Sequence, residues 1–391
     1  MSRITPLRLT RTREYLLAKN AVKRLVYGAR RGLVPPAPHR PAVVAARDLP
    51  LEAADPVRLE WPAEVPKPLV GLVKDPDWTS YWERYARFLT TNEIPYDFYP
   101  VHRSDWLAAA EPFDIILWRP MSTPAELDEC RRKVHVLERH LGKLCYPSLD
   151  QAMLYEDKVL QYELLRRKGL PVVDTFVSFD RDEARTRLPR LSYPAVWKLS
   201  TGSGSLGVEL VPDARTALRR ARRVFSFTGR RSYWPYVAQK DYVFLQERVP
   251  DSPEDVRVIV IGDILLGYMR AVPSGDFRAS GMGMQRRGAL PEAAMRLAVR
   301  TAREFDIPSM AVDMLADANG DYRIIELSLF VQVRTCGSQQ VDGVPGYYRA
   351  AGDSFVFTPA LVWTQELMLR EFLRRTWLKK EVRGTIQRDR E

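Results

Sequence analysis

Apolar and amphipathic segments alternate along residues 68–150. Short apolar runs predict buried strands at residues 68–75, 95–102, 113–120 and 143–148. Between them, apolar positions recur with helical spacing, which predicts helices at residues 80–92 and 124–142. Strands that alternate with helices are typical of a parallel sheet with helices packed on it. We therefore expect a parallel α/β domain in this part of the chain.

The pattern changes after residue 150, where strands follow one another through short turns. A helix is predicted at residues 155–168, and Gly169 and Pro171 mark its C-terminal end. Strands are predicted at residues 172–179, 194–211 (two strands and a loop), 244–249, 255–262, 263–272, 310–317 and 322–329. Further helices are predicted at residues 181–188, 214–223, 291–305 and 358–380. The fold class is therefore expected to be α/β at the N-terminal side and α+β beyond it.

The positive charge of the chain is concentrated at its two ends. The chain has 391 residues and a net charge of +11, and residues 1–40 alone hold ten Lys and Arg against one acid, Glu14. A nucleic-acid-binding protein is expected to carry such charge on its folded domain, so nucleic acid is not the partner we expect. Residues 33–67 are rich in proline, which predicts an extended linker after this basic arm.

Leucine and valine recur among the basic residues at 11–31, which predicts an amphipathic helix. Three roles are open for it: docking at an anionic membrane surface, contact with nucleic acid, or packing against the body or against a second subunit of a homodimer. The aromatic anchors of a membrane helix are scarce, with only Tyr15 and Tyr27. We favour packing or a subunit contact.

Composition argues against several other classes of protein. No run approaches the roughly 18 apolar residues of a membrane-spanning helix. The basic N-terminus lacks the apolar stretch of a secretory signal. The three cysteines are too few and too far apart for a disulfide framework or a zinc site. These features predict a cytoplasmic protein.

Two acidic residues are predicted to face each other across the hairpin at residues 310–329. Asn319-Gly320 between two apolar strands indicates a two-residue turn of type I′. In that register Asp313 lies opposite Glu326 at about 5 Å, and Ser328 shares their face because side chains alternate along a strand. Carboxylates this close repel unless a proton or a cation intervenes. A solvated hairpin is the alternative, but both acids stand in apolar runs, so we favour a divalent cation.

A lysine precedes a glycine- and serine-rich loop at residues 198–207, KLSTGSGSLG. Backbone N–H groups of such a loop can approach phosphate oxygens closely, and Lys198 supplies a positive charge. The loop matches neither the Walker nor the dinucleotide pattern, so a flexible hairpin tip is an alternative. Lys158 opens a predicted helix, where acids are normally preferred, and is a second candidate cation. A solvated lysine is the alternative there.

Charged residues also flank two of the predicted antiparallel strands. Asp255 and Arg257 begin one strand and Arg270 ends the next, ahead of the loop GDFRAS at residues 275–280. Both arginines can cluster at one end of this hairpin, where they would suit a phosphate or a carboxylate substrate. Ordinary surface arginines are the alternative.

In chain order these features resemble the ATP-grasp superfamily, in particular the ATP-binding domains of the glutathione synthetase and ribosomal-protein S6 glutamyl ligase type. The resemblance covers residues 68–332. It rests on the order of the motifs Asp157-Lys158, Lys198 with its loop, Gln246-Glu247-Arg248-Val249, Asp255-Val256-Arg257, Gly275-Asp276-Phe277-Arg278, Val312-Asp313 and Ile325-Glu326. It implies a parallel α/β pre-ATP-grasp domain followed by an ATP-grasp fold of two subdomains.

Five segments are expected on this basis. They are a basic arm and linker at 1–67, the pre-ATP-grasp domain at 68–150, a lid subdomain with the glycine-rich loop at 151–243, a core subdomain with the metal site at 244–350, and a C-terminal helix at 351–391.

The resemblance further implies which residues bind ATP. Lys158 and Lys198 would contact its phosphates, beneath a loop that contains Ser203, Gly204, Ser205 and Gly207. The hinge at the adenine would consist of Glu247, Arg248 and Val249, and Asp255 would lie near the ribose.

By the same resemblance, Arg278 would meet the γ-phosphate and the acyl phosphate, and Arg257 and Arg270 would face the acceptor. Asp313 and Glu326, with Ser328, would hold one or two Mg²⁺ ions. The implied reaction is ligation: ATP activates a small-molecule or peptide carboxylate as an acyl phosphate, which an amine or related nucleophile attacks. No side-chain nucleophile is needed for it.

Two positions depart from the family pattern. Ser328 stands where the family has Asn, and Ser280 where its nearest branch has Asn. A hydroxyl is a weaker Mg²⁺ ligand than an amide carbonyl, so a second ion would bind poorly. An ATP-binding pseudoenzyme or scaffold is therefore one alternative function, and a kinase-like phosphotransferase is another.

Overall fold

The computed structural model describes residues 51–76, 80–202, 204–205, 207–234, 236–250, 252, 254–272, 285–333, 336 and 339–380. The helices and strands named below lie in one compact unit, residues 49–75 and 79–391. The basic arm up to residue 50, Ser203 and Arg278 lie outside the described residues, so what we expect of them stays a prediction. Within the described ranges, every helix is too short or too polar to span a membrane.

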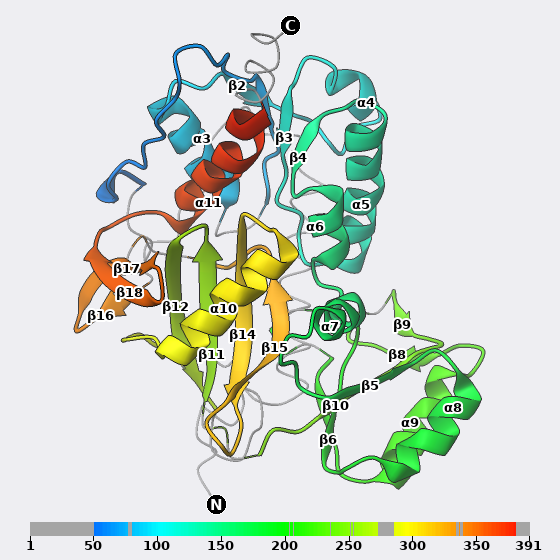
Figure 1. The fold of residues 1–391 in the computed structure, drawn as a ribbon. Coiled ribbons are helices and arrows are strands. Elements are labelled where there is room, and N and C mark those ends of the chain that lie inside the picture. Colours follow the sequence, from blue (N-terminus) through cyan, green and yellow to red (C-terminus); the bar gives the residue numbers. More distant parts are fainter. Residues whose placement is uncertain are drawn as a thin grey trace, which may run out of the picture. The chain divides into compact units, whose positions relative to one another are not determined.

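The first sheet is parallel, as the alternation of strands and helices predicts. Its strands run in the order β2 (Tyr96–Phe98), β1 (Val70–Leu72), β3 (Ile115–Leu117) and β4 (Leu144–Tyr146). Its helices are α3 (Tyr81–Thr91), α4 (Trp106–Ala109), α5 (Pro124–Arg139) and α6 (Leu149–Leu154), shown in blue and cyan in Figure 1. Strands β1 and β3 are buried throughout, because a parallel sheet is covered on both faces.

The second sheet is antiparallel and follows helix α7 (Lys158–Arg167). Its strands run in the order β5 (Thr175–Ser178), β10 (Val243–Glu247), β6 (Ala195–Trp197) and β7 (Glu209–Val211). Helices α8 (Arg181–Arg187) and α9 (Ala214–Val224) cover one face, where Trp197 and Leu245 join their apolar side chains in one cluster. A short hairpin of β8 (Arg230–Arg231) and β9 (Ala238–Gln239) lies beside it.

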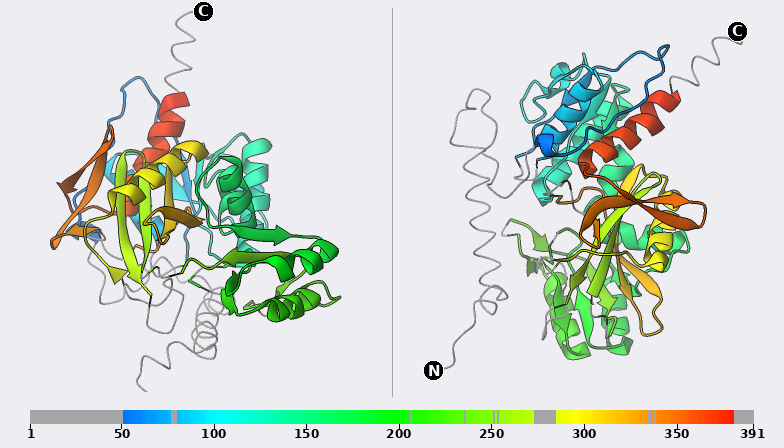
Figure 2. Two further views of the ribbon diagram at one scale, coloured as in Figure 1. Left: turned by 60° about the horizontal axis from the view of Figure 1, so that its bottom comes forward. Right: turned by 90° about the vertical axis from the view of Figure 1, so that its left-hand side faces the viewer.

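The third sheet is also antiparallel. Its strands run in the order β15 (Tyr322–Ser328), β14 (Ser309–Ala316), β11 (Glu254–Ile261), β12 (Ile264–Ala271), β17 (Val344–Ala351) and β16 (Gln340–Val341). Strand β13 (Gln285–Arg286) pairs with β12, and β18 (Ser354–Pro359) with β17. Helix α10 (Glu292–Phe305), yellow in Figures 1 and 2, lies across one face and buries Ala294 and Ala298 there.

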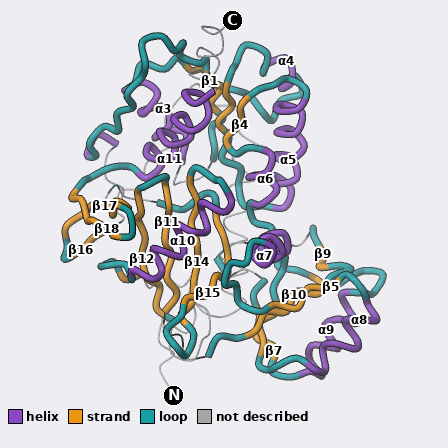
Figure 3. The backbone as a smooth tube through the Cα atoms, viewed as in Figure 1, coloured by secondary structure: helices purple, strands orange, loops and turns teal. Residues whose placement is uncertain are grey.

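The first and third sheets share one apolar core, to which the C-terminal helix contributes. Tyr146 of β4 stacks on Phe372 with ring centroids 4.8 Å apart, and its hydroxyl bonds Ser309 of β14 over 2.7 Å. The mixed parallel and antiparallel architecture confirms the predicted fold class, and Figure 3 shows its strands in orange.

The predicted helix at residues 358–380 is wrong at its start. Residues 354–359 form β18, and helix α11 (Thr364–Leu373) begins after it and ends in a π-helical turn, Arg374–Leu378. In β18 the exposed Val356 lies between the partly buried Phe355 and Phe357, which is the period of a strand. The C-terminal segment expected to be a helix over 351–391 therefore opens with a hairpin.

The predicted linker at residues 33–67 is wrong in its second half. Residues Leu51–Ala53 form a 3₁₀ turn, and Val57 and Val65 are each only 4% exposed within the main core. The N–H of Val57 donates to the Glu366 carboxylate of α11 over 3.3 Å. Proline fixes the local backbone, but the apolar side chains between the prolines bind this segment to the fold.

Candidate functional site

The hairpin of β14 and β15 places Asp313 opposite Glu326, as predicted from the sequence. Ser328 pairs with Ala311, two residues farther along both strands, and so shares the face of the two acids. Asp313 is 3% exposed and Ser328 7% exposed. The acids therefore form a pair on one face of the third sheet.

The predicted two-residue turn is wrong, although the pairing is right. Ala316 pairs with Tyr322, and the N–H of Asp317 donates to the carbonyl of Asp321, so the loop is one residue longer than expected. The Asp317 carboxylate stabilises it by accepting from the N–H groups of Asn319 and Asp321. A bulge at Ile325 then returns the register to the predicted one.

Two arginines bind Asp313. Arg257 donates through Nε and Nη2 to its two oxygens over 2.5 and 2.6 Å, and Arg270 donates through Nη2 over 2.8 Å. Burial raises the pKa of Asp313, but Arg257 and Arg270 outweigh it and hold that pKa well below the usual range. Asp313 is therefore a carboxylate at any physiological pH.

Asp255 extends this network. It lies opposite Arg270 on the neighbouring strand and accepts a 2.5 Å hydrogen bond from its Nε. Burial raises the pKa of Asp255 to about 6, against the opposing effect of Arg270. One network of ion pairs thus connects four predicted site residues. They are Asp255, expected near a ribose, Arg257 and Arg270, expected at the acceptor, and Asp313, expected at a metal.

Lys158 connects this region to the glycine-rich loop. The helix predicted at 155–168 is α7, which begins three residues later than predicted. Lys158 is its first residue and the Asp157 side chain caps it. The Nζ of Lys158 lies 2.9 Å from Glu326 Oε1 and donates to the carbonyl of Gly202 over 2.5 Å. Burial opposes the charge of Lys158, but Glu326 and Glu156 raise its pKa overall. One ammonium group thus bridges the acid pair and the loop.

Gln161 fixes the distance between α7 and β15. Its Nε2 donates to the carbonyl of Leu327 and its Oε1 accepts from the N–H of Leu327, both over 2.9 Å. Leu327 separates Glu326 from Ser328, so this contact sets both side chains relative to Lys158. We did not predict this residue: glutamine in a helix carries no sign of a partner 166 positions away.

Lys198 continues strand β6 and is 7% exposed. Its N–H donates to Phe244 and its Nζ to Gln246 Oε1 over 2.5 Å. Burial lowers the pKa of Lys198 to about 8, although Glu326 opposes this shift. Among the described residues no carboxylate forms an ion pair with this buried ammonium group, which lies within the electrostatic reach of Lys158, Glu326 and Asp313.

The glycine-rich loop returns to the strand that precedes it. Its residues Gly204, Ser205 and Gly207 have left-handed backbones, with φ of +62°, +60° and +74°. The carbonyl of Gly207 accepts from the N–H of Leu199, and a Cβ at Gly207 would come within 2.4 Å of the Leu199 side chain. Glycine is therefore required at position 207 by both conformation and space.

The predicted hinge residues follow the end of β10. Glu247 is its last residue, and its N–H donates to the carbonyl of Asp174 over 2.8 Å. Arg248 and Val249 come next and are partly exposed. No contact of the described residues assigns any of these three a role, so the hinge stays a prediction.

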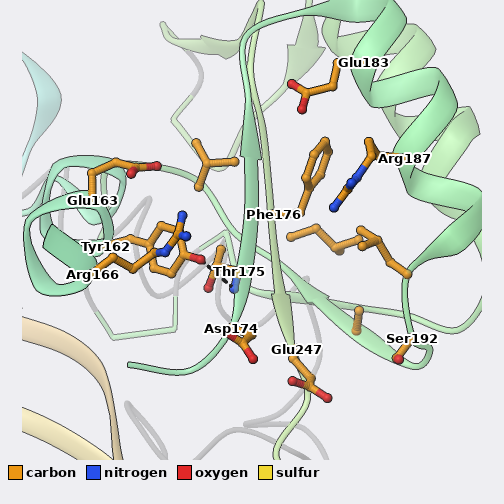
Figure 4. Close-up of a pocket in the computed structure, with 14 residues that line it drawn as sticks. Tyr162, Glu163, Arg166, Asp174, Thr175, Phe176, Glu183, Arg187, Ser192 and Glu247 are labelled. Atoms are coloured by element: carbon orange, nitrogen blue, oxygen red, sulfur yellow. Dashed lines mark hydrogen bonds between the residues drawn. The ribbon is translucent and has the colours of Figure 1, made fainter. Parts of the chain in front are cut away.

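A pocket of about 490 Å³ lies beside the second sheet, on the face that α8 and α9 cover (Figure 4). Phe176, Ala195 and Leu245 line it, and these residues share the face of Trp197, whereas Gln246 beside Lys198 points to the opposite face. Charged side chains of α7 and α8 also line it, among them Arg166 and Arg187, which Figure 4 labels. Neither Lys158 nor Lys198 lines this pocket.

Residues 155–342 match the model of the RimK-like ATP-grasp domain. The chain is 25% identical over 182 residues to the "Probable alpha-L-glutamate ligase" of Haemophilus influenzae (strain PittEE), covering 46% of this chain and 57% of that one. It is 31% identical over 169 residues to the glutamate–LysW ligase ArgX of Sulfolobus acidocaldarius, covering 43% and 55%. For ArgX of Sulfurisphaera tokodaii the identity is 25% over 253 residues, covering 62% and 83%. The chain thus spans little more than half the length of the first two relatives.

Proposed function

Residues 155–342 form an ATP-grasp domain of the RimK-like type, and from that premise we propose that the protein is an ATP-dependent ligase. It activates a carboxylate as an acyl phosphate, and an amine or related nucleophile displaces the phosphate. The relatives with which the chain shares this domain are named as ligases that use glutamate. An amino-acid or peptide carboxylate is therefore the first substrate class to test.

The position of Lys158 is the observation that carries this proposal. Its ammonium group contacts Glu326 on one side and the loop carbonyl of Gly202 on the other. Lys198 lies near enough for Lys158 to lower its pKa. A triphosphate bound beneath the loop would meet two buried cations there, which neutralise the charge on a transferred phosphoryl group.

We expect the acid pair to bind Mg²⁺ when nucleotide phosphates complete its ligands, with Asp313 giving up part of its contact with Arg257 and Arg270. Mg²⁺ typically binds one or two carboxylates together with substrate phosphates, which matches Asp313 and Glu326, with the Ser328 hydroxyl as a weak third ligand. Among the described residues, no group of three or more His, Cys, Asp or Glu side chains could hold a metal on its own. The ion would supply charge neutralisation at the phosphates.

The chain's own charged groups account for the remaining steps. Arg257 and Arg270 orient Asp313 and keep it ionised. Together with Arg278 they supply positive charge for the acyl phosphate and the acceptor. The reaction needs no side-chain nucleophile, because ATP itself provides the activating group.

ADP release from the full-length protein tests the proposal. We would screen carboxylates, with L-glutamate first, against amines in the presence of Mg²⁺, beside the variants Lys198→Ala and Glu326→Ala. Both variants should lose about a hundredfold or more in kcat/KM, whereas Lys240→Ala, at an exposed lysine of the same region, should not.

Three outcomes would contradict ligation. ATP binding without ADP release for every substrate pair indicates a pseudoenzyme. A phosphorylated product without an amide indicates a phosphotransferase. Equal losses in Lys198→Ala and Lys240→Ala would mean that Lys198 has no special role.

A further inference from the structure

Residues 181–231 form a further concentration of positive charge, on the folded part of the chain. They hold eleven arginines and one lysine against four acids, a net charge of +8 in a chain whose total is +11. The lysine is the buried Lys198, so the charge on the outer surface of this segment comes from arginine alone. The positive charge is therefore not confined to the two ends of the chain.

The arginines face water because the opposite sides of their helices are buried. Helix α9 packs Ala217 and Ala221 against the second sheet, and α8 packs Ala184 there. The two helices lie side by side (Figures 1 and 3). All three arginines of α8 are exposed, and so are four on α9, namely Arg215, Arg219, Arg222 and Arg223. These seven side chains form a broad basic surface, which we call the α8–α9 face.

The stability of the fold does not account for this row of charge. Arg215, Arg219 and Arg223 stand four residues apart on α9, where like charges repel and destabilise a helix. Arg215 also lies in the first turn, where a positive charge opposes the helix dipole. Among the described residues, neither Arg222 nor Arg223 forms an ion pair. Their guanidinium groups are therefore available to an anion from outside the chain.

The turn after α9 holds a phenylalanine out in water. Phe227 is 96% exposed, the highest value among the large apolar side chains that the structure describes. Two hydrogen bonds fix this turn: Ser226 Oγ donates to the carbonyl of Arg223 over 2.7 Å, and the N–H of Gly229 donates to the carbonyl of Ser226 over 3.1 Å. Gly229 has a left-handed φ of +69°, and a Cβ there would come within 2.8 Å of the Gln239 carbonyl. The ring thus projects from a defined turn beside the arginines.

A broad cationic face with a projecting aromatic ring matches an anionic lipid bilayer. Basic side chains are attracted to anionic headgroups, and an aromatic ring enters the boundary between headgroups and acyl chains. Arginine suits this role because its planar fork binds phosphate oxygens in pairs. Single-stranded nucleic acid instead lies in a charged groove whose aromatic rings stack on successive bases. Here the charge spreads over two neighbouring helices and the ring stands at the end of one of them, which favours the bilayer.

We propose that the α8–α9 face docks on an anionic membrane surface. Its arginines bind lipid phosphates, and the Phe227 ring inserts at the level of the upper acyl chains. The docking surface belongs to the folded part of the chain and is separate from the basic arm at residues 1–35. The inference does not depend on the proposed ligase function, because docking needs neither ATP nor an acceptor.

Co-sedimentation of the full-length protein with vesicles tests this. The vesicles are an equal mixture of phosphatidylcholine and phosphatidylglycerol, beside vesicles of phosphatidylcholine alone. Arg219→Ala/Arg222→Ala should weaken binding to the anionic vesicles about thirtyfold. Phe227→Ser should weaken it about tenfold, and Phe227→Trp should retain it. The matched control is Arg139→Ala/Arg303→Ala, which removes the same charge from exposed positions of α5 and α10 and should bind like the wild type.

Four outcomes would overturn the proposal. Equal losses in the two double variants would mean that net charge alone governs binding. Wild-type binding by Arg219→Ala/Arg222→Ala would leave the basic arm as the contact, and wild-type binding by Phe227→Ser would place the ring outside the bilayer. A wild-type protein that binds a polyuridine oligonucleotide but not the anionic vesicles would make this face a nucleic-acid surface. Thermal unfolding confirms that the variants are folded: Arg219→Ala/Arg222→Ala should melt no lower than the wild type, because it removes repulsion between like charges.

Discussion

Gln161 holds both backbone groups of Leu327 with one side-chain amide. The two hydrogen bonds, each 2.9 Å long, join the first turns of α7 to the strand that carries Glu326 and Ser328. Because Lys158 begins the same helix, this single contact fixes the cation and the carboxylate of the Lys158–Glu326 pair relative to each other. Gln161 is therefore a positioning residue of the candidate site.

Replacing Gln161 with leucine should destabilise the protein. The variant leaves the N–H and the carbonyl of Leu327 buried without partners, at a loss of about 2–4 kcal/mol in the free energy of unfolding. Urea unfolding followed by circular dichroism measures it. Glu163→Leu, on the exposed side of the same helix, should unfold like the wild type. Equal curves for Gln161→Leu and wild type would contradict the role given to this contact.

The pairing of Asp313 with Glu326 was predictable because alternation along the strands leaves few registers for a short hairpin. The predicted pairing is correct because two unpredicted features compensate each other. The loop is longer by one residue and shifts the register, and the bulge at Ile325 shifts the register back. The bulge depends on tertiary structure, because Val173 donates to the carbonyl of Ile324 from a segment far away in sequence. Local patterns carry no sign of such a contact.

Other features escaped prediction for related reasons. Glu156 fell inside a predicted continuous helix, but it has a left-handed backbone with φ of +57° in the turn between α6 and α7. The C-terminal helix was predicted from residue 358, within the end of β18, because the apolar residues there run on into those of α11. The pocket of Figure 4 combines residues from α7, α8 and three strands, which no single stretch of sequence reveals.

The affinity for ATP should weaken above about pH 8. Burial lowers the pKa of Lys198 to about 8, so this ammonium group loses its proton as the pH rises through that value. Each further pH unit then reduces the charged fraction, and with it the affinity, by up to about tenfold. Calorimetric titration with ATP at pH 7, 8 and 9 and constant ionic strength measures this. In Lys198→Met the affinity should be low and nearly independent of pH; a wild-type affinity that is flat over this range would argue against a phosphate contact by Lys198.

Restoring the amide at position 328 should strengthen magnesium binding. Ser328 lies on the face of Asp313 and Glu326, and an amide carbonyl is a better Mg²⁺ ligand than a hydroxyl. Ser328→Asn should therefore lower the Mg²⁺ concentration that gives half-maximal ADP release by roughly threefold or more. Ser354→Asn, at an exposed serine of β18, is the control. A higher Mg²⁺ requirement in Ser328→Asn would indicate that position 328 does not face the ion.

The stability of the protein should reveal the charge of Glu156 through its dependence on pH. Burial raises the pKa of Glu156 to about 7, so between pH 4.5 and 7 the folded protein keeps a proton that the unfolded chain has released. The stabilisation from this proton is complete below pH 4.5 and is lost as the pH rises through 7, at up to about 1.4 kcal/mol per pH unit. Glu156→Gln cannot ionise, so its stability relative to wild type in urea unfolding should increase from pH 5 to about pH 7 and level off above that value. Parallel pH profiles would mean that Glu156 ionises normally in the folded protein. A difference that rises up to about pH 7 would show that the fold retains a buried carboxylate whose ionisation is destabilising.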